Sequence, residues 1–491
     1  MDHNNAIIQF LLNDEIRQID FEQDKNLSPT TTVLNYIRDF EHLKGVKEGC
    51  AEGDCGACTL VLAELDQKDE LIYKSFTSCI VFLPYLNGKQ VFTVEYLADK
   101  QNGITRFHPV QESLVKTNGS QCGYCTPGFV MSLFSLFKTN KSPEREDIEQ
   151  ALSGNLCRCT GYQSILDAAY LVKDYPRLDK FSNLKEVQIK KLKEFSQNKS
   201  NFLIERPNEV YFQPHSLQQA LEYKREYPEA VLIGGASDLA LLKTKKHQIL
   251  PHLLDLSQII ELKSIVDKGH YWEIGAGVSI EQLRISFNSK FPAFLKMLNV
   301  FGSQQIRNLA TIGGNLGSGS PIGDTLPVLM AHQAELLIEN ADEQRTEKLE
   351  DYLLGYRKTS LMPDEIITKV LLPSDEGQII WSEKISKRRD LDIATVSAGF
   401  ALKLTKNNKV QSLILAYGGL AAITKRASET EEFLLGKDWE KQTIEEAMAI
   451  LEEEFVPLSD ARAEANGRKL LAKNLLMKFY IYTLSLKVRM S

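Results

Sequence analysis

All eight cysteines of this chain lie between Cys50 and Cys159, and the 332 residues that follow, 160–491, contain none. The first residues, MDHNNAIIQFLL, lack the basic start and the cleavage site of a signal peptide, so a cytosolic protein is expected. In the cytosol disulfides are rare, and grouped cysteines serve more often as metal ligands or redox groups. The distribution therefore predicts sulfur chemistry in the first third and a different task for the rest.

The bulk composition excludes several classes of protein. A net charge of −7 argues against nucleic acid as the main partner, because binding to phosphates normally needs a basic surface. No stretch approaches the 18 or more consecutive apolar residues of a membrane helix, so no membrane partner is expected. A length of 491 residues is typical of about three domains.

The first cysteine set is Cys50-x4-Cys55-x2-Cys58, followed by Cys79 after twenty intervening residues. This is the plant-type ferredoxin spacing of a [2Fe–2S] cluster. The glycines of the segment GVKEGCAEGDCGAC let the backbone turn tightly so that three thiolates converge. The alternatives are unrelated buried cysteines or a zinc site, but zinc sites favour C-x2–4-C pairs on both sides.

The second set is Cys122-x2-Cys125 with Cys157-x-Cys159. Four thiolates suffice for a second [2Fe–2S] cluster, although this set alone also fits zinc. Thr126-Pro127 next to Cys125 predicts an N-cap and a helix start, and an anionic cluster is favourable at such an end. Two clusters in tandem indicate electron transfer, because a purely structural role would need only one.

The hydrophobic pattern divides the chain into five parts. It predicts a small mixed α/β region over about the first 85 residues, a helical region at about 95–176, a linker at 177–200, alternating strands and helices at about 201–375, and an α+β unit at about 376–491. For 177–200, which is rich in lysine, an exposed helix is an equal alternative. Further helix starts are expected at Ser142-Pro143 and, through a capping box, at Thr443.

Two glycine-rich segments follow residue 200. VLIGGASDLALLK, 231–243, predicts a strand, a Gly-Gly turn that binds an anion or is simply tight, and a helix. TIGGNLGSGSPIGD, 311–324, allows close approach of a phosphate-bearing ligand or is a surface loop. Asp324 could accept from ribose hydroxyls or cap a helix. Lys384 or Lys387 could lie near a flavin or on a solvated face.

Several blocks together resemble the xanthine dehydrogenase family of molybdenum hydroxylases, among them GVKEGCAEGDCGACTL, QCGYCTPGFVMS, GNLCRCTGYQSI and RNLATIGGNLGSGSPIGDTLPVL. The resemblance covers nearly the whole chain. It implies a multidomain α+β fold: a ferredoxin-like β-grasp [2Fe–2S] domain (1–88), a helical-bundle [2Fe–2S] domain (89–176), a linker (177–200), an FAD-binding α+β domain of the vanillyl-alcohol-oxidase/PCMH type (201–375) and a C-terminal α+β flavoprotein subdomain (376–491).

The resemblance also implies roles for matched positions. Cys50, Cys55, Cys58 and Cys79 would hold the cluster nearer the flavin, and Cys122, Cys125, Cys157 and Cys159 the cluster nearer molybdenum. Gln121 would face the molybdopterin partner. The FAD pyrophosphate would be held by Leu232, Ile233, Gly234, Gly235, Ala236, Ser237, Asp238 and Leu239, and other parts of FAD by Phe301, Thr311, Gly314, Asn315, Asp324, Ile367 and Lys384.

The function that the resemblance implies is electron transfer. The chain is similar to the small subunit of a bacterial two-subunit enzyme, with FAD and two [2Fe–2S] clusters as cofactors. A large molybdopterin-binding subunit would oxidise hypoxanthine and xanthine to urate, NAD+ would accept the electrons, and two copies of each subunit would form a heterotetramer. No catalytic acid or base is expected on this chain. The alternatives are an aldehyde- or nicotinate-type hydroxylase subunit, a free-standing NADH-oxidising iron–sulfur flavoprotein, and a zinc-bound scaffold.

Overall fold

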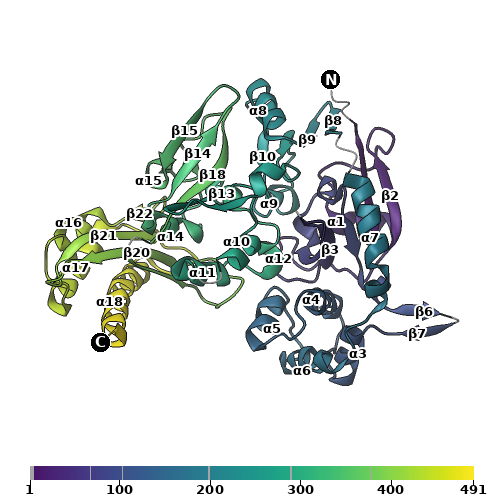
Figure 1. The fold of residues 1–491 in the computed structure, drawn as a ribbon, viewed down its shortest axis with the longest axis horizontal. Coiled ribbons are helices and arrows are strands. Elements are labelled where there is room, and N and C mark those ends of the chain that lie inside the picture. The colour runs from purple at the N-terminus through teal and green to yellow at the C-terminus, as the bar shows by residue number, and fades with distance from the viewer. Residues whose placement is uncertain are drawn as a thin grey trace. The chain divides into compact units, whose positions relative to one another are not determined.

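The computed structural model describes residues 5–66, 68–101, 103–196, 200–287, 290–375 and 377–490. The chain forms two compact units (Figure 1). Unit 1 comprises Met1–Ser216, Glu229–Ile259 and Ser303–Ala310, and unit 2 comprises Leu217–Pro228, Ile260–Gly302 and Thr311–Ser491. Among the described residues, no helix is both long and apolar enough to cross a membrane.

Unit 1 begins with a mixed sheet in the order β2-β1-β5-β3-β4, in which β1 pairs parallel to β5 and the other neighbours pair antiparallel. In β1 the alternate residues Ile8, Phe10 and Leu12 are buried, as expected for a strand with one face on the core. The elements are β1 (Ile7–Leu12), β2 (Glu15–Asp20), α1 (Val33–Asn35), η1 (Tyr36–Phe40), β3 (Thr59–Leu65), β4 (Leu71–Thr77), η2 (Ser78–Ile80), η3 (Leu83–Leu86) and β5 (Gln90–Phe92).

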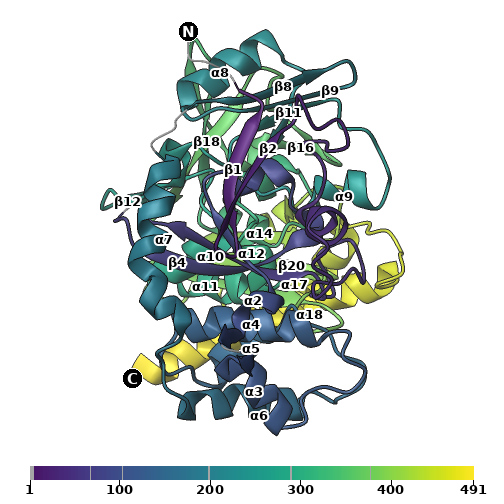
Figure 2. The same cartoon turned by 90° about the vertical axis from the view of Figure 1, so that its right-hand side faces the viewer.

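A group of short helices follows in unit 1, and Figure 2 shows α3, α4, α5 and α6 side by side. Helix α4 is apolar on almost every side and most of its residues are buried, which is typical of a central helix. The elements are α2 (Val94–Leu97), β6 (Asp99–Gln101), β7 (Ile104–Arg106), α3 (Pro109–Lys116), α4 (Thr126–Thr139), α5 (Arg145–Leu152), α6 (Gln163–Leu171) and η4 (Val172–Asp174).

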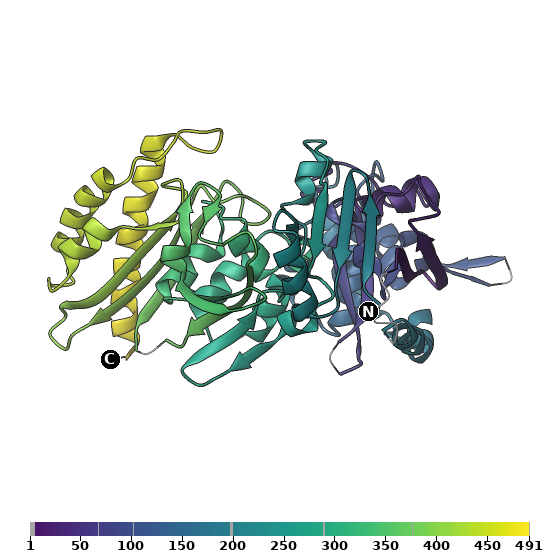
Figure 3. The same ribbon diagram turned by 90° about the horizontal axis from the view of Figure 1, so that it is seen from above.

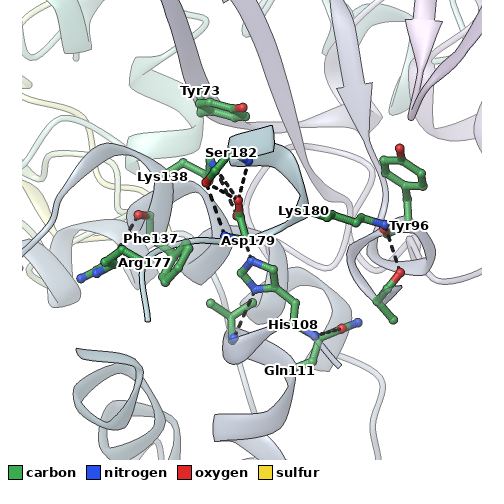
Figure 4. Close-up of polar contacts among 12 residues, drawn as sticks. Tyr73, Tyr96, His108, Gln111, Phe137, Lys138, Arg177, Asp179, Lys180 and Ser182 are labelled. Carbon is green, nitrogen blue, oxygen red and sulfur yellow. Dashed lines mark hydrogen bonds and ion pairs between the residues drawn. The ribbon is translucent and has the colours of Figure 1, made fainter. Parts of the chain in front are cut away.

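The segment predicted as a linker or an exposed helix forms helix α7 (Lys180–Ser196). Phe181 and Leu192 are buried, so the helix packs on the unit instead of spanning solvent. Asp179, just before the helix, anchors it: its carboxylate contacts Nε2 of His108 at 3.2 Å and Nζ of Lys138 at 3.1 Å (Figure 4). The lysine-rich composition is typical of the solvent-facing side of a helix, and it gave no sign of the apolar side that packs on the unit.

Burial and charge act in opposite directions on this anchor. Burial raises the pKa of Asp179, but the hydrogen bond with His108 and the positive charge of Lys138 lower it below its ordinary value. Burial lowers the pKa of His108 more than Asp179 raises it. The anchor is therefore formed by an ionised carboxylate and a neutral imidazole.

The last part of unit 1 is a sheet in the order β10-β11-β9-β8, whose residues share one core with the first sheet. That core includes Phe10 and Phe21 from the start of the chain and Phe202 and Leu253 from this sheet. In the same unit, Arg307 on helix α12 is buried and donates a hydrogen bond to Gln150 at 2.8 Å. The elements are β8 (Phe202–Arg206), β9 (Glu209–Gln213), β10 (Val231–Ile233), α9 (Ala240–Thr244), β11 (His252–Asp255) and α12 (Gln304–Arg307).

Unit 2 contains an antiparallel sheet in the order β12-β13-β18-β14-β15 (Figure 1). Its elements are α8 (Leu217–Glu226), η5 (Ile260–Lys263), β12 (Ile265–Asp267), β13 (Tyr271–Gly275), α10 (Ile280–Ser286), α11 (Pro292–Asn299), α13 (Ile312–Gly317), α14 (Thr325–Ala331), β14 (Glu335–Glu339), β15 (Gln344–Lys348), α15 (Leu349–Tyr352), β16 (Leu353–Gly355), β17 (Lys358–Thr359) and β18 (Ile366–Pro373).

A second antiparallel sheet of unit 2, β19-β20-β21-β22, is covered by helices, and the yellow helix α18 crosses its green strands in Figure 3. In the core between them Trp381 stacks on Phe400, and Phe479 packs edge-on against Phe400. The elements are β19 (Ile379–Ile385), β20 (Val396–Leu404), β21 (Val410–Gly418), β22 (Lys425–Arg426), α16 (Ser428–Leu434), α17 (Lys441–Glu454) and α18 (Ala465–Met490).

Three predicted helix starts are displaced by a few residues. Helix α4 is capped at Cys125, with Thr126 as its first residue. Helix α5 begins at Arg145 behind a capping box of Glu144 and Asp147, not at Ser142-Pro143. Helix α17 begins at Lys441, so the capping box predicted at Thr443 was wrong. In each case the helix type was predicted correctly, but several residues near the start could serve as a cap.

Candidate functional site

The first thiol site is formed by a loop and a short helical turn of unit 1. Cys50, Cys55 and Cys58 lie on the loop that leads into β3, and Cys79 lies on η2 at the end of β4. The Sγ atoms of Cys58 and Cys79 are 3.3 Å apart, and the thiol of Cys50 interacts with those of Cys55 and Cys79. The structure thus brings together all four cysteines of the first predicted set.

The backbone of this loop is arranged for negative charge on sulfur. Sγ of Cys50 accepts hydrogen bonds from the N–H groups of Glu52 (3.5 Å), Asp54 (3.3 Å) and Cys55 (3.3 Å). The Cys55 thiol donates to Cys50, which holds the pKa of Cys50 far below its usual value and raises that of Cys55. Donors aimed at a thiolate favour its charged form and hence its use as a metal ligand.

The second thiol site lies where α4 begins and where the loop after α5 passes. Cys125 interacts with Cys157, and Cys122 interacts with Cys159. Burial and the hydrogen bond with Cys157 raise the pKa of Cys125 to about 12, while Thr160 donates to Sγ of Cys157 at 3.2 Å. The structure therefore also brings together the second predicted set.

Both sites fit a thiolate-bound iron–sulfur cluster by the chemistry of their donors. All eight cysteines have free thiols, and each set of four provides the ligands that one [2Fe–2S] cluster requires. Over the described ranges, no three His, Cys, Asp or Glu side chains converge closely enough to hold a single metal ion. The fit to a cluster consequently rests on the paired thiols and on the N–H groups that face Cys50.

The predicted pyrophosphate segment, 232–239, joins β10 to α9 in unit 1. Ala236 adopts a left-handed backbone conformation with φ +58°, which is rare for a residue with a side chain and is found at ligand-binding turns. A Cβ atom on Gly235 would lie 1.8 Å from the carbonyl oxygen of Leu309, so only glycine fits there. The turn is half-buried and is held in a strained form, as expected for a backbone anion site.

The predicted residues Thr311, Gly314 and Asn315 lie at the start of α13 in unit 2. Oγ1 of Thr311 accepts from the N–H of Gly314 at 3.0 Å, and Asn315 accepts from the Thr325 hydroxyl at 2.6 Å. Ile312 and Leu316 are buried. The first half of the 311–324 segment is therefore an ordered helix, and the surface-loop alternative was wrong for it.

Lys384 and Asp324 form a buried ion pair in unit 2. Nζ of Lys384 lies 2.6 Å from Oδ2 of Asp324 and donates to the carbonyl of Val300 at 3.0 Å. Asp324 occupies the N-cap position of α14, as its alternative predicted, but its side chain makes no capping hydrogen bond. Lys384 is buried, which excludes a solvated face for this residue, whereas Lys387 is exposed.

One oxygen of Asp324 remains available in this pair. Its Oδ1 is buried and has no hydrogen-bond partner among the described residues. Burial raises the pKa of Asp324, and the charge of Lys384 opposes this effect. An orphaned buried acceptor costs free energy unless a ligand satisfies it, so this observation fits a bound group with hydroxyl or N–H donors.

The remaining predicted positions have simple surroundings. Ile367 is buried in β18, Phe301 is half-buried after α11, and Gln121 is exposed beside Cys122. The predicted FAD residues fall in both units: 232–239 belong to unit 1, and Phe301, Thr311, Gly314, Asn315, Asp324, Ile367 and Lys384 belong to unit 2.

The sequence interpretation missed several polar residues next to the thiol sites. Lys245 donates to the carbonyl of Cys50 at 3.0 Å and lies 3.5 Å from the carboxylate of Glu52. Gln305, Asn155 and Ser132 form a buried hydrogen-bonded group. A lysine or an amide far along the chain from the cysteines gives no local signal of such contacts.

Family models match most of the chain. Residues 93–170 match a [2Fe-2S] binding domain, residues 201–375 match the FAD binding domain in molybdopterin dehydrogenase, and residues 381–483 match the CO dehydrogenase flavoprotein C-terminal domain. The first match contains the whole second thiol set. It favours the [2Fe–2S] prediction for that set over the zinc alternative.

Xanthine dehydrogenase of Emericella nidulans is 33% identical over 94% of this chain and 38% of its own length. Among solved structures, CO dehydrogenase from Oligotropha carboxidovorans is 25% identical, with a TM-score of 0.52 over 56% of this chain and 96% of its own. Quinoline 2-oxidoreductase from Pseudomonas putida 86, at 23% identity, shares the fold, with a TM-score of 0.52 over 57% of this chain and 98% of its own.

The chain therefore spans well under half the length of the curated relatives it matches, and the matched part is the part with [2Fe–2S]- and FAD-binding domains. The expected multidomain α+β architecture is confirmed. This chain belongs to the molybdenum hydroxylase family, as an oxidoreductase component that transfers electrons through [2Fe–2S] and FAD groups.

Proposed function

We propose that this chain is the electron-transfer subunit of a xanthine dehydrogenase, which carries electrons from a molybdopterin-containing partner to NAD+ during the oxidation of hypoxanthine and xanthine to urate. The observation that carries the proposal is the presence of two four-thiol sites in a chain that also matches an FAD-binding domain. The relative named xanthine dehydrogenase, aligned with 94% of the chain, supports the choice of substrate.

The cofactors supply the redox chemistry: iron–sulfur clusters exchange single electrons, and FAD exchanges two. The residues of this chain hold and tune them. Cys50, Cys55, Cys58 and Cys79 would hold the first cluster, with backbone N–H groups stabilising the sulfur charge at Cys50. Cys122, Cys125, Cys157 and Cys159 would hold the second.

For FAD, the turn 232–239 would hold the pyrophosphate through its backbone N–H groups. Residues of α13 and its N-cap, Thr311, Gly314 and Asn315, would bind further polar groups, and Phe301 and Ile367 would supply apolar contact. The free Oδ1 of Asp324 would accept a hydrogen bond from the cofactor, while Lys384 holds the other oxygen in place.

The partner would bind where the second thiol site reaches the surface. Cys122 and Cys159 are exposed, as are Gln121, Tyr124 and Leu156 close to them in the sequence. Such a mixture of polar and large apolar side chains is suited to a protein interface. We expect a large molybdopterin subunit there, in a heterotetramer with two copies of each subunit. Substrate hydroxylation needs no acid or base from this chain.

Purification of the native complex tests the proposal. We expect about four irons and one FAD per copy of this chain, a co-purifying molybdenum subunit, and reduction of NAD+ by xanthine. Activity with an aldehyde or nicotinate instead would assign the chain to another molybdenum hydroxylase. A lone chain that oxidises NADH would support the free-standing reductase, and a colourless protein rich in zinc would rule out electron transfer.

A further inference from the structure

Gln305, on α12, is completely buried in unit 1. Its Nε2 has three acceptors within hydrogen-bond distance, which share its two hydrogens: Oγ of Ser132 at 2.9 Å, the carbonyl of Ala151 at 3.2 Å and Oδ1 of Asn155 at 3.0 Å. The residue lies within the match to the FAD-binding domain, whereas all three of its partners lie within the match to the [2Fe-2S] binding domain. A buried amide with this many partners fixes the relative position of the segments it joins.

Asn155 passes this constraint on to the loop of the first site. Its Oδ1 accepts from Gln305 and from the hydroxyl of Ser132 at 2.6 Å, so its Nδ2 points the other way. Nδ2 donates to the carbonyl of Gly56 at 3.1 Å and to Oγ1 of Thr59 at 3.2 Å. Gly56 directly follows Cys55, and Asn155 precedes the loop that carries Cys157.

Next to this contact, a backbone hydrogen bond joins the loop that carries Cys55 to the loop that carries Cys157. The N–H of Leu156 donates to the carbonyl of Cys55 at 3.0 Å. Cys55 is a predicted ligand of the first cluster, and Leu156 is bonded to Cys157, a predicted ligand of the second. The loops approach so closely that a Cβ on Gly56 would lie 2.1 Å from the carbonyl oxygen of Gly154, so only glycine fits at this crossing.

We propose that Gln305 is a positioning residue for electron transfer between the two clusters. By orienting Asn155 it holds the Leu156-to-Cys55 hydrogen bond, which provides a short bonded route from Cys157 to Cys55. One electron leaves the second cluster, which is oxidised, and enters the first, which is reduced; no bond forms or breaks and no proton moves. The inference rests on the proposed function, because it requires a cluster at each thiol site.

The test compares Gln305→Leu with the matched control Gln304→Leu in the purified native complex. The first variant removes the donors but keeps most of the volume, and the second makes the same change at a half-buried neighbour. Three quantities are measured: iron and FAD content, hydrogen exchange of the Leu156 amide, and the magnetic coupling between the clusters in EPR spectra after full reduction with dithionite.

We expect Gln305→Leu to retain iron and FAD, to accelerate exchange at Leu156 about tenfold, and to change the splitting of the EPR signals, with Gln304→Leu unchanged in all three. A purely structural role would lower cofactor content and thermal stability but leave the splitting of intact protein as in the wild type. Unchanged exchange and unchanged splitting in a fully loaded Gln305→Leu protein would overturn the proposal.

If Gln305→Leu cannot be obtained as folded protein, Ser132→Ala tests the positioning role instead. It removes one of the two hydrogen bonds that are donated to Oδ1 of Asn155. The hydroxyl-bearing Ser132→Thr should restore the wild-type splitting if the hydrogen bond is what matters. The two proposals fail differently. Absence of iron from the wild type would overturn the proposed function together with the electron route, whereas two clusters that are insensitive to Gln305 and Ser132 would overturn only the positioning role.

Discussion

Each of the two thiol sites has four cysteines, but the two sites differ in how far their cysteines are buried. In the first site Cys58 and Cys79 are buried in the core of unit 1, whereas in the second Cys122 and Cys159 are exposed. The first is built on a β-sheet and its loop, and the second on a helix start and two loops. In the proposed function, this difference would suit a division of work, in which the enclosed site relays electrons and the open site exchanges them with the partner protein.

The strongest test of this contrast replaces one cysteine in each site. Cys58→Ser and Cys159→Ser should each lose about two of about four irons per chain, together with the EPR signal of one cluster. Only Cys58→Ser should also markedly lower Tm, because it places an unsatisfied hydroxyl in the core. Iron analysis, EPR and thermal melting check these outcomes. Equal Tm losses for the two variants would contradict the difference in burial.

A second test compares the heat stability of the two thiol sites after the Asp179 contacts that anchor α7 are weakened. Asp179→Asn leaves Lys138 buried without its counter-charge and should destabilise unit 1 by about 3–5 kcal/mol. We expect the EPR signal of the second site to disappear first on heating, because Lys138 and His108 belong to its helical region. The control is Asp69→Asn, which removes an exposed partner of Lys193 on the same helix and should cost less than about 1 kcal/mol.

The same anchor predicts a pH dependence. Because the pKa of His108 is lowered in the folded protein, the unfolded chain binds a proton at higher pH, and stability is lost as pH falls below about 6.5. The lowered pKa of Asp179 adds a further loss below about 3.9. Melting curves between pH 7.5 and 5 should show a decline that is smaller in His108→Gln. A decline of the same size in the variant would exclude His108 as its source.

The smallest expected effect concerns only the first site. Lys245→Gln removes a positive charge that donates to the carbonyl of Cys50, so the reduced and more negative cluster should be less stable. Since Lys245 is largely exposed, the reduction potential should fall by on the order of 10–40 mV. Redox titration followed by EPR measures it. The second cluster and the control Lys246→Gln should remain unchanged; a shift at both sites would indicate a general effect of net charge.

The sequence was sufficient to predict the thiol sites because their ligands follow local rules of spacing. Cys50, Cys55 and Cys58 lie on one loop, and Cys122 and Cys125 lie next to a helix start, so the geometry follows from a few neighbouring residues. The same holds for the strand, turn and helix around 231–243. Local pattern is less reliable at boundaries, as the helix starts at Thr126 and Lys441 show.

What the sequence could not predict depends on residues far apart in the chain. Gln305 and Asn155 are separated by 150 positions, and neither stands in a motif that announces the other. The role of α7 was hidden because Asp179 and its partner His108, 71 positions earlier, look like ordinary surface residues. Tertiary contacts of this kind need the fold before they can be recognised.

The short segment Ser303–Ala310 belongs to unit 1, although the chain on both sides of it belongs to unit 2. Besides Gln305, it supplies Asn308, which donates to the carbonyl of Ser75 at 2.8 Å. A fragment that ended before residue 200 would keep every cysteine, yet Ser132 and Asn155 would lose their hydrogen bonds with Gln305, and part of the apolar core would lose residues that pack in it. Unit 1 is thus completed by a segment from within the stretch that matches the FAD-binding domain, and an independent iron–sulfur chain would need other side chains in place of Gln305 and Asn308.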